Sequence, residues 1–385
     1  MTAIGFPKGY HSLHANISMN FQMNRWYSWV GEPEMLDEMR EAAPRMRNYT
    51  DWKREFLALA KKASRDGHVL RSGFYYRSAE FFMNSADPDR KDARDKFLDA
   101  VRQVYGSELK GYHSIPYTDG GLNGLLPAYR FKPGRSKGTI VFFGGFDSYI
   151  EECVPAYLYL RDAGYEVVAF EGPGQGGVLE AGTPMSPEWH KPVKAVLDYF
   201  ELDHVALIGL SMGGCLAMRA AAFEPRVDRV VAFDILTDFF DVNLRQTNPV
   251  IRSLLAGLIR VRAVPIVNLV VSLAARKSPV VEWGIAQGMR VTGTLSPFAL
   301  LLNLRRFQTG DVSSFVKQDV LLLCGSLDHY VPIEQLYRQI GLLTNARSVT
   351  ARLFTPSESA QNHCQVGNYG LALKAIVDWL DEIQN

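Results

Sequence analysis

Cysteine is scarce in this sequence, and the few cysteines lie far apart. The 385 residues contain Cys153, Cys215, Cys324 and Cys364, with no C-x-x-C pair among them. Structural zinc sites and disulfide frameworks need closely or regularly spaced cysteines, so we expect neither. We interpret all four as free thiols in a reducing, cytoplasmic compartment, and nothing in the sequence indicates a cofactor or a metal ion.

Neither sign of charge is in excess, and long hydrophobic runs are missing. The 42 lysines and arginines nearly balance 41 aspartates and glutamates, a formal net charge of +1. Such a chain has no strong overall field to gather phosphate backbones or acidic lipids, so nucleic acid is not an expected partner. The first residues lack the basic start and apolar core of a signal peptide. The most apolar stretch, residues 253–275, contains Arg260, Arg262 and Pro265, so we expect cap-forming or buried helices there and no membrane span.

The first part of the chain shows apolar residues at helical spacing. Apolar residues recur three or four positions apart in residues 33–43, 52–66 and 92–105. Strand-like segments first occur as YHSIPY and LLPAYRF, which flank a turn-rich stretch and predict a hairpin. We therefore predict an N-terminal helical domain over residues 1–110 and a catalytic domain over residues 111–385.

Short apolar runs then alternate with helical patterns, as expected of a mostly parallel sheet that is covered on both faces. The runs lie at residues 139–145, 165–172, 204–210, 229–234, 319–325 and 349–354. A helix over residues 369–382 is expected to follow them. The longest gap, between the fourth and fifth runs, predicts a helical cap over about residues 236–315.

The strongest functional motif follows the third apolar run. Gly209, Ser211 and Gly213 form G-x-S-x-G between an apolar strand and a helical run. This context is typical of a nucleophile elbow, where glycines leave room for a strained serine backbone. The alternative interpretation is an ordinary glycine-rich turn with a capping serine. We predict that Ser211 is a nucleophile.

A serine hydroxyl needs a base to remove its proton, and the base needs a carboxylate to orient it. His363 follows the last predicted strand and precedes the final helix, although an exposed loop histidine is the alternative. Asp328 leaves the run at 319–325 through a G-x-x-D loop and is the predicted acid. Asp234, at the end of the preceding run, is its rival, and we expect His329 to point elsewhere.

Hydrogen-bond donors should face the oxyanion that acyl chemistry develops. We predict that the backbone N–H groups of Met212 and Phe146 supply them, and that Gly145 lets the main chain approach the substrate closely. A simple βα turn is the alternative interpretation of this loop. Residues 172–177, GPGQGG, match a dinucleotide-binding fingerprint, but no helix clearly begins there, so we assign them to a loop that shapes the site wall.

Further phrases in the chain resemble a known family. They are NFQMNRW (20–26), YYRSAEFF (75–82), GGFDSYIEE (144–152), EGPGQG (171–176) and NHCQVGN (362–368). With the motifs above, the chain resembles the α/β-hydrolase family that includes 2,6-dihydroxypseudooxynicotine hydrolase, the fungal polyketide-shortening hydrolases of melanin pigment formation and, more distantly, the FrsA-like esterases. The resemblance runs from about residue 15 to the C-terminus.

The resemblance implies an α/β-hydrolase fold whose helical N-terminal segment helps to roof the active site, often in a homodimer. By that analogy Phe21, Tyr75 and Tyr76 are candidates for lining the pocket, although helical aromatics more often belong to a core. It also implies hydrolysis of a carbon–carbon bond in a β-dicarbonyl or aryl ketone. Some relatives use an additional acid, for which Asp234 and Asp238 are the nearest candidates.

The sequence therefore predicts a serine hydrolase that attacks a carbonyl carbon of a small hydrophobic, aromatic or polyketide-like substrate. An ester, a thioester or a carbon–carbon bond is cut, through an acyl-enzyme or through water that His363 activates. An acyltransferase or cyclase with the same triad is the first alternative. A non-catalytic ligand-binding relative is the second.

Overall fold

The predicted apolar runs form a central β-sheet. In the computed structural model, which describes residues 4–245 and 247–383, the strands are β1 (Tyr112–Asp119), β2 (Leu122–Phe131), β3 (Thr139–Phe143), β4 (Glu166–Phe170), β5 (Val205–Leu210), β6 (Val227–Phe233), β7 (Asp319–Gly325) and β8 (Ser348–Phe354). Every residue of β5 and β7 is buried. Strands that are covered on both faces read as continuous apolar runs, which is why the sequence pattern located them.

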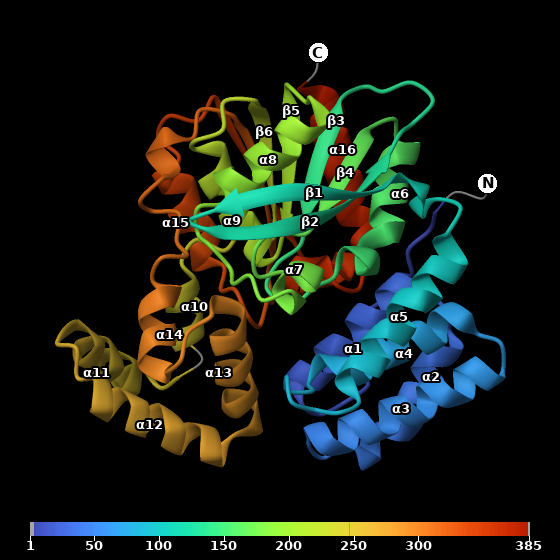
Figure 1. The fold of residues 1–385 in the computed structure, drawn as a ribbon, viewed down its shortest axis with the longest axis vertical. Helices are drawn as coiled ribbons and strands as arrows, with labels where there is room; N and C mark the ends of the chain where they lie inside the picture. Colours follow the sequence, from blue (N-terminus) through green and yellow to red (C-terminus); the bar gives the residue numbers. More distant parts are fainter. Residues whose placement is uncertain (1–3, 246, 384–385) are drawn as a thin grey trace.

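The strand order brings the carboxyl ends of the parallel strands to one edge of the sheet. Within the described residues the order is β1-β2-β4-β3-β5-β6-β7-β8 (Figure 1). The predicted hairpin of β1 and β2 is confirmed as an antiparallel pair, β2 pairs antiparallel with β4, and the remaining neighbours are parallel. The loops that follow β3, β5, β7 and β8 therefore meet, and ligand sites form at such an edge.

Helices cover both faces of this sheet. They are α6 (Val154–Asp162), α7 (Gly176–Glu180), α8 (His190–Phe200), α9 (Met212–Ala221), α15 (Glu334–Leu342) and α16 (Tyr369–Glu382), the last as predicted. Alternate residues of β3 enter different cores: Phe142 packs with residues of α6 and α16, whereas Val141 packs with residues of α8 and α9. Short 3₁₀ turns complete the chain, at η1 (Ala43–Arg45), η2 (Leu109–Gly111), η3 (Ile150–Cys153), η4 (Ser313–Phe315), η5 (Pro356–Glu358) and η6 (His363–Gln365).

The N-terminal segment is helical, as predicted, and precedes the first strand. Its helices are α1 (Ile17–Val30), α2 (Glu34–Ala42), α3 (Tyr49–Arg65), α4 (Val69–Phe81) and α5 (Arg90–Tyr105). Spacing located α2, α3 and α5, but not α1 and α4, because these two are buried almost all round and have no polar face. Trp26 and Phe74 of this segment belong to the same hydrophobic core as Phe142 of the sheet.

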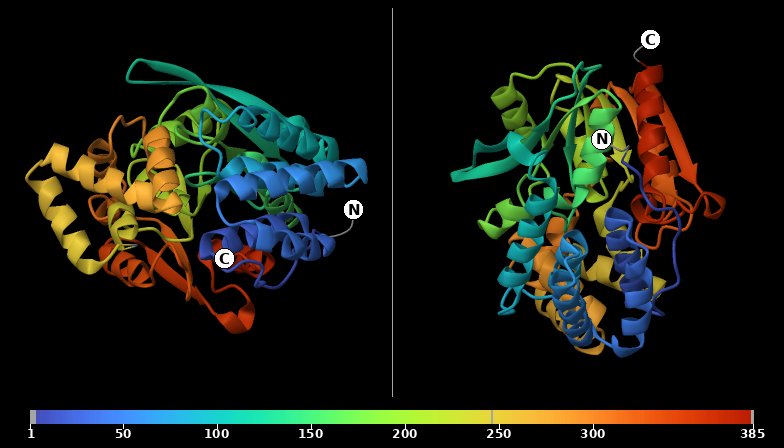
Figure 2. Two further views of the ribbon diagram at one scale, coloured as in Figure 1. Left: turned by 90° about the horizontal axis from the view of Figure 1, so that it is seen from below. Right: turned by 90° about the vertical axis from the view of Figure 1, so that its right-hand side faces the viewer.

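A second group of helices lies between β6 and β7, where the cap was predicted. They are α10 (Phe239–Arg245), α11 (Pro249–Arg260), α12 (Val264–Lys277), α13 (Pro279–Thr292) and α14 (Pro297–Leu304). Seen from below, the blue N-terminal helices and the gold cap helices lie side by side across the sheet's edge (Figure 2). No helix in the described ranges combines the length and apolar character that a bilayer crossing requires.

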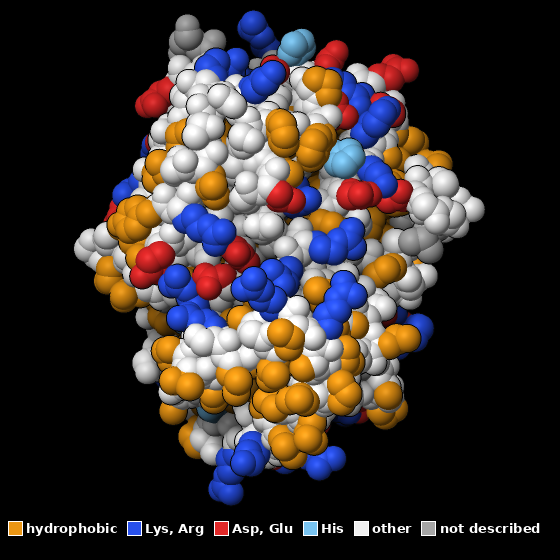
Figure 3. All heavy atoms as spheres, turned by 90° about the vertical axis from the view of Figure 1, so that its left-hand side faces the viewer, with side chains coloured by type: hydrophobic (Ala, Val, Ile, Leu, Met, Phe, Trp, Pro, Cys, Tyr) orange, Lys and Arg blue, Asp and Glu red, His pale blue; other side chains and the backbone are white. Residues whose placement is uncertain are grey.

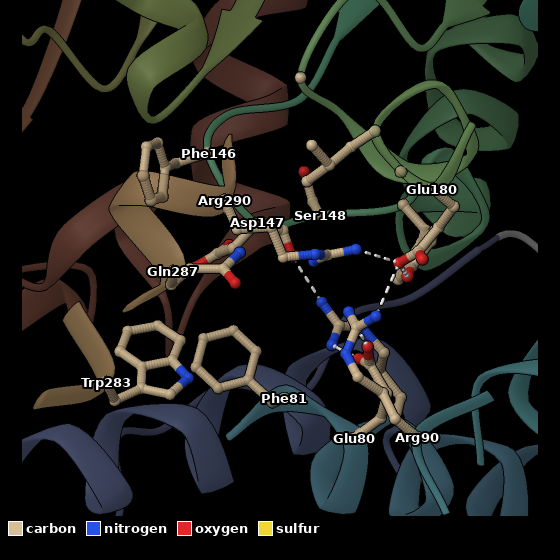
Figure 4. A pocket seen from close by; sticks show the side chains of 15 residues that line it. Glu80, Phe81, Arg90, Phe146, Asp147, Ser148, Glu180, Trp283, Gln287 and Arg290 are labelled. Atoms are coloured by element: carbon tan, nitrogen blue, oxygen red, sulfur yellow. Dashed lines mark hydrogen bonds and ion pairs between the residues drawn. The ribbon is translucent and has the colours of Figure 1, made fainter. Parts of the chain in front are cut away.

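The cap, the N-terminal helices and the loop after β4 meet around Glu180, at the end of α7. Its carboxylate pairs with Arg290 of α13 at 2.6 Å and with Arg90 of α5 at 2.9 Å. Beside these ion pairs, Trp283 of α13 stacks on Phe81 of α4 with ring centroids 5.3 Å apart (Figure 4). Glu180 thus connects the two covers of the sheet edge to each other and to the loop after β4.

Candidate active site

Ser211 occupies the sharp turn between β5 and α9 in a strained backbone conformation, with φ of +61°. A Cβ atom on Gly209 would lie 1.9 Å from the carbonyl oxygen of Gly213, and one on Gly213 would lie 2.7 Å from that of Gly144. Both positions therefore need glycine for steric reasons. The turn is further held by a 2.6 Å hydrogen bond from the Ser211 N–H to the Phe233 carbonyl, so the hydroxyl is presented at the sheet's edge.

The structure brings Ser211, His363 and Asp328 together from three separate loops. Ser211 Oγ lies 2.8 Å from His363 Nε2, and His363 Nδ1 lies 2.6 Å from Asp328 Oδ2. The other oxygen of Asp328 accepts hydrogen bonds from the backbone N–H groups of Tyr330 and Val331, at 2.7 and 2.9 Å. With Nδ1 donating to the carboxylate, Nε2 faces the serine hydroxyl as an acceptor, which is the arrangement that proton removal requires.

Asp234, the alternative acid, lies near His363 but does not hydrogen-bond to it. Asp234 is fully buried, and its Oδ2 is 3.9 Å from His363 Nδ1, beyond hydrogen-bond distance. The same oxygen accepts the N–H of Cys364, so Asp234 anchors the loop that carries the histidine. Asp238 is paired with Arg338 at 3.2 Å instead. Neither of these aspartates lines the cavity that Ser211 faces.

Burial and neighbouring charges shift the pKa values of His363, Asp328 and Asp234. Burial alone lowers the pKa of His363, but the adjacent Asp328 carboxylate raises it well above its usual value. Burial raises the pKa of Asp328, but His363 and the backbone donors outweigh it and hold it below the ordinary value. Burial and then the charge of Asp328 raise the pKa of Asp234 well above its usual value, so of the two acids Asp234 is the one whose neutral form is favoured.

Asp234, Asp328 and His363 also place possible metal-ligand atoms within 4.8 Å of one another. However, His363 Nδ1 and Asp328 Oδ2 are 2.6 Å apart and already hydrogen-bonded. A cation between them would have to separate this pair. The donor set therefore fits a hydrogen-bonded histidine–carboxylate pair better than a metal site.

The loop after β3 packs against the elbow. A Cβ on Gly145 would lie 2.9 Å from the carbonyl oxygen of Leu210, so this close approach to the elbow favours glycine. Gln175, from the predicted site-wall loop, donates its side-chain amide to the carbonyls of Gly144 and Gly145, at 2.6 and 3.1 Å. Within the described residues, the N–H groups of Met212 and Phe146 donate to no protein acceptor. Both donors of the predicted oxyanion hole are therefore available.

Ser211 and His363 open into a cavity of about 980 Å³ between the N-terminal helices and the cap. Phe21 and Gly145, two of the predicted lining residues, are part of its wall. His329 also lines it, contrary to our expectation, because its ring packs between Phe21 and Tyr330. Burial lowers the pKa of His329 to about 4, which makes it a neutral wall residue. Most of the wall is apolar, with contributions from Leu236, Phe239, Leu255, Val271, Trp283 and Leu301.

The prediction that Tyr75 and Tyr76 line this pocket is wrong. Tyr75 is fully buried among the N-terminal helices, and its hydroxyl donates to Glu38 at 2.8 Å. Tyr76 lies beneath the ammonium group of Lys96, 4.9 Å from its ring centroid. Both side chains point into the contacts that α4 makes with its neighbouring helices, so they belong to the core of that segment.

Sequence reasoning missed Arg25 and Trp29, which line the cavity from α1. They follow Phe21 at steps of four residues, a helical spacing that could have found them once Phe21 was placed. Arg25 is partly buried and pairs with Asp147 at 3.1 Å and Glu152 at 2.7 Å. This cluster places charged groups in one part of a mostly apolar wall.

Comparison with known proteins places the chain in a family. Residues 141–352 match the model of the alpha/beta hydrolase fold, and the match covers more than half of the chain. The protein therefore belongs to the α/β-hydrolase family, and it is a hydrolase.

Two fungal relatives illustrate the range of similarity. The chain is 30% identical over 366 residues to the hydrolyase ccsE of Aspergillus clavatus, covering 84% of this chain and 81% of that protein. It is 36% identical over 212 residues to the alpha/beta hydrolase psoB of Aspergillus fumigatus, covering 46% of each. The predicted resemblance to fungal hydrolases is confirmed.

Solved structures share the fold at lower identity. The 2,6-dihydroxy-pseudo-oxynicotine hydrolase superposes with a TM-score of 0.61 at 19% identity, over 92% of this chain and 94% of that one. AbyA5 superposes with a TM-score of 0.66 at 16% identity, over 92% and 90% of the two chains. Both matches extend over nearly the whole chain and therefore include the N-terminal segment.

Proposed function

We propose that the protein is a serine hydrolase in which Ser211 is the nucleophile, His363 the general base and Asp328 the acid that orients it. The observation that carries this proposal is the 2.8 Å contact between Ser211 Oγ and His363 Nε2 at a strained elbow. The 2.6 Å contact from His363 Nδ1 to Asp328 supports it, because it holds Nε2 in the acceptor form.

In the first step His363 takes the proton of Ser211, and Oγ forms a bond to the substrate carbonyl carbon. The carbonyl π electrons move to oxygen, where the N–H groups of Met212 and Phe146 stabilise the negative charge. The tetrahedral intermediate then collapses, and the leaving group departs with the proton from His363. Water, deprotonated by His363, hydrolyses the acyl-enzyme and restores Ser211.

The substrate that we propose is a hydrophobic aromatic or polyketide-like molecule with a reactive ester, thioester or ketone carbonyl. A cavity of about 980 Å³ lies at the large end of small-molecule sites, and its mostly apolar wall suits such a molecule. Because Asp234 and Asp238 lie outside the cavity, we do not assign either a contact with substrate. Asp147 and Glu152, which follow the oxyanion loop, are acids that do line the cavity.

We further propose that residues 1–110 and the cap at about 236–315 set specificity as two covers over a catalytic unit of residues 111–385. Both contribute to the cavity wall: α1 supplies Phe21, and the cap supplies Trp283. Their joint contact at Glu180 suits covers that close over the same ligand.

A fluorophosphonate probe tests the nucleophile directly. We expect covalent labelling of the wild type and hydrolysis of p-nitrophenyl esters, with both lost in Ser211→Ala. Ser18→Ala is the matched control, because Ser18 also lines the cavity but lies on α1, outside the elbow. Labelling that persists in Ser211→Ala would overturn the assignment. Product analysis with an added alcohol separates hydrolysis from acyl transfer, and β-diketones test carbon–carbon cleavage.

A further inference from the structure

The outer surface of the cap is apolar although it faces solvent. On α11 and just after it, Val250, Leu254 and Val261 are 76%, 59% and 72% exposed. On α12, Ile266, Leu269 and Leu273 are likewise exposed. In each helix these positions recur three, four or seven residues apart and therefore share one face. Apolar side chains gather over the lower part of the molecular face on this side, with basic side chains beneath them (Figure 3).

The inner faces of the same helices are apolar too. Ile259 of α11 and Val267 and Val271 of α12 are buried in a small core with Phe298 and Leu301 of α14. Helices that bury one apolar face usually present polar residues on the other. A contiguous apolar surface on the outside therefore indicates a binding surface.

The charge around this surface is of one sign. Residues 242–281 contain no aspartate or glutamate. Arg260 and Arg262 precede α12, and Arg276 and Lys277 end it, so that exposed cations flank both ends of the helix. Whereas Arg245 pairs with acids outside this stretch, these four form no ion pair with another residue that the structure describes.

We propose that the α11–α12 hairpin docks this hydrolase on the surface of a membrane that contains anionic lipids. An exposed apolar face flanked by arginine and lysine is the combination that lies in the lipid interface without crossing it. A second copy of the chain fits the surface less well. A two-fold contact pairs a patch with itself, so the cations would face one another with no acid in residues 242–281 to neutralise them.

The docking surface is continuous with the cavity wall. Ile251 and Val280 are both about half exposed and both line the cavity. Val271 and Ala274 of α12 line it from the same hairpin. A hydrophobic substrate dissolved in the bilayer would therefore reach the cavity beneath the hairpin with little exposure to water. The inference concerns how substrate is presented and does not depend on which residue is the nucleophile.

Vesicle sedimentation of the full chain tests this proposal. We expect binding to phosphatidylcholine–phosphatidylserine vesicles, weaker binding to phosphatidylcholine alone, and weakening by salt. The double variant Leu254→Glu/Leu269→Glu should bind at least about tenfold more weakly, because it places two charges in the apolar face. Leu125→Glu is the matched control, since Leu125 is 56% exposed on β2, far from the cap in sequence, and it should bind like the wild type.

Light scattering on the same samples measures the oligomeric state and so tests whether a second copy of the chain covers the α11–α12 surface. The proposal would be overturned in favour of a second copy by two results together. The wild type would bind neither kind of vesicle, and it would form a dimer that Leu254→Glu/Leu269→Glu converts to monomer. Vesicle binding that the double variant retains would overturn it as well. A thermal unfolding midpoint close to that of the wild type in every variant shows that the fold is intact, and this control does not depend on the identity of the nucleophile.

Discussion

Replacing Asp328 by asparagine tests the proposed triad most sharply, because Asp234 lies close by as a rival. The amide would keep the size of the side chain but remove the charge that faces His363 Nδ1 at 2.6 Å. At an effective dielectric constant of about 20, that charge stabilises the imidazolium by about 6 kcal/mol. The imidazolium forms as Ser211 loses its proton, so most of this energy is lost in the transition state.

We therefore expect Asp328→Asn to lower kcat about 10⁴-fold, at about 1.4 kcal/mol for each factor of ten. The same change in other Ser-His-Asp enzymes has an effect of about this size. KM should change little, because Asp328 does not line the cavity. The assay is steady-state hydrolysis of a p-nitrophenyl ester, with the active fraction titrated by the fluorophosphonate probe.

Asp234→Asn is the matched control. Burial and the neighbouring carboxylate raise the pKa of Asp234, so an amide replaces an acid whose neutral form is favoured. We expect a loss of less than about tenfold in kcat, since no charge near the imidazole changes. The reasoning is refuted if Asp328→Asn keeps a tenth of wild-type kcat while Asp234→Asn falls further.

Three further results follow from the site and the contacts between its covers. Because Asp328 raises the pKa of His363 and only the neutral imidazole is a base, kcat/KM should fall as pH decreases through a midpoint above the usual histidine value; Asp328→Asn should move that midpoint down, as a pH–rate profile would record. Gln175→Ala removes both hydrogen bonds to the oxyanion loop, so kcat should fall about tenfold to a hundredfold at similar KM. Glu180→Gln should lower the free energy of unfolding by about 1–3 kcal/mol in urea titrations. The arginines hold the pKa of Glu180 at about 2 despite burial, so its contribution is present above the ordinary glutamate pKa and is lost as pH falls toward 2.

Two of these results have a matched control variant. Gln318→Ala removes a similar amide-to-carbonyl hydrogen bond at Ala221 and should leave kcat unchanged. Asp37→Asn breaks an exposed ion pair with Arg40 and should change stability by less than about 0.5 kcal/mol. A wild-type midpoint below the usual histidine pKa, equal kcat losses in the two glutamine variants, or equal stability losses in the two acid variants would contradict the respective argument.

The sheet and the candidate triad could be predicted because each has a local signature. Apolar runs locate strands that are buried on both faces, and G-x-S-x-G between a strand and a helix identifies the turn at Ser211. His363 and Asp328 could be predicted because each lies in a loop that follows a predicted strand, in the chain order that this fold uses for its base and acid. Their convergence within hydrogen-bond distance depends on the parallel register of β5, β7 and β8, which no single segment encodes.

Features that depend on which way a buried helix faces could not be predicted. Helix α4 is apolar or paired on every side, so spacing alone could not show that Tyr75 faces Glu38 and not the cavity. The acid and the bases at Glu180 come from three segments far apart in the chain. Likewise, the burial of Asp234 beside Asp328 is a property of the assembled sheet edge, and sequence distinguished the two acids only by loop position.

The single core that joins Trp26 and Phe74 to Phe142 has a consequence for engineering this enzyme. An N-terminal boundary drawn at Tyr112 would strip large aromatic partners from one side of the β-sheet, and the truncated product should aggregate instead of giving a smaller catalyst. Chimeras between relatives would need to exchange the helices together with the sheet residues that they touch. The N-terminal helices are therefore inherited as part of the folding unit, and their divergence is limited by the packing that they share with the sheet.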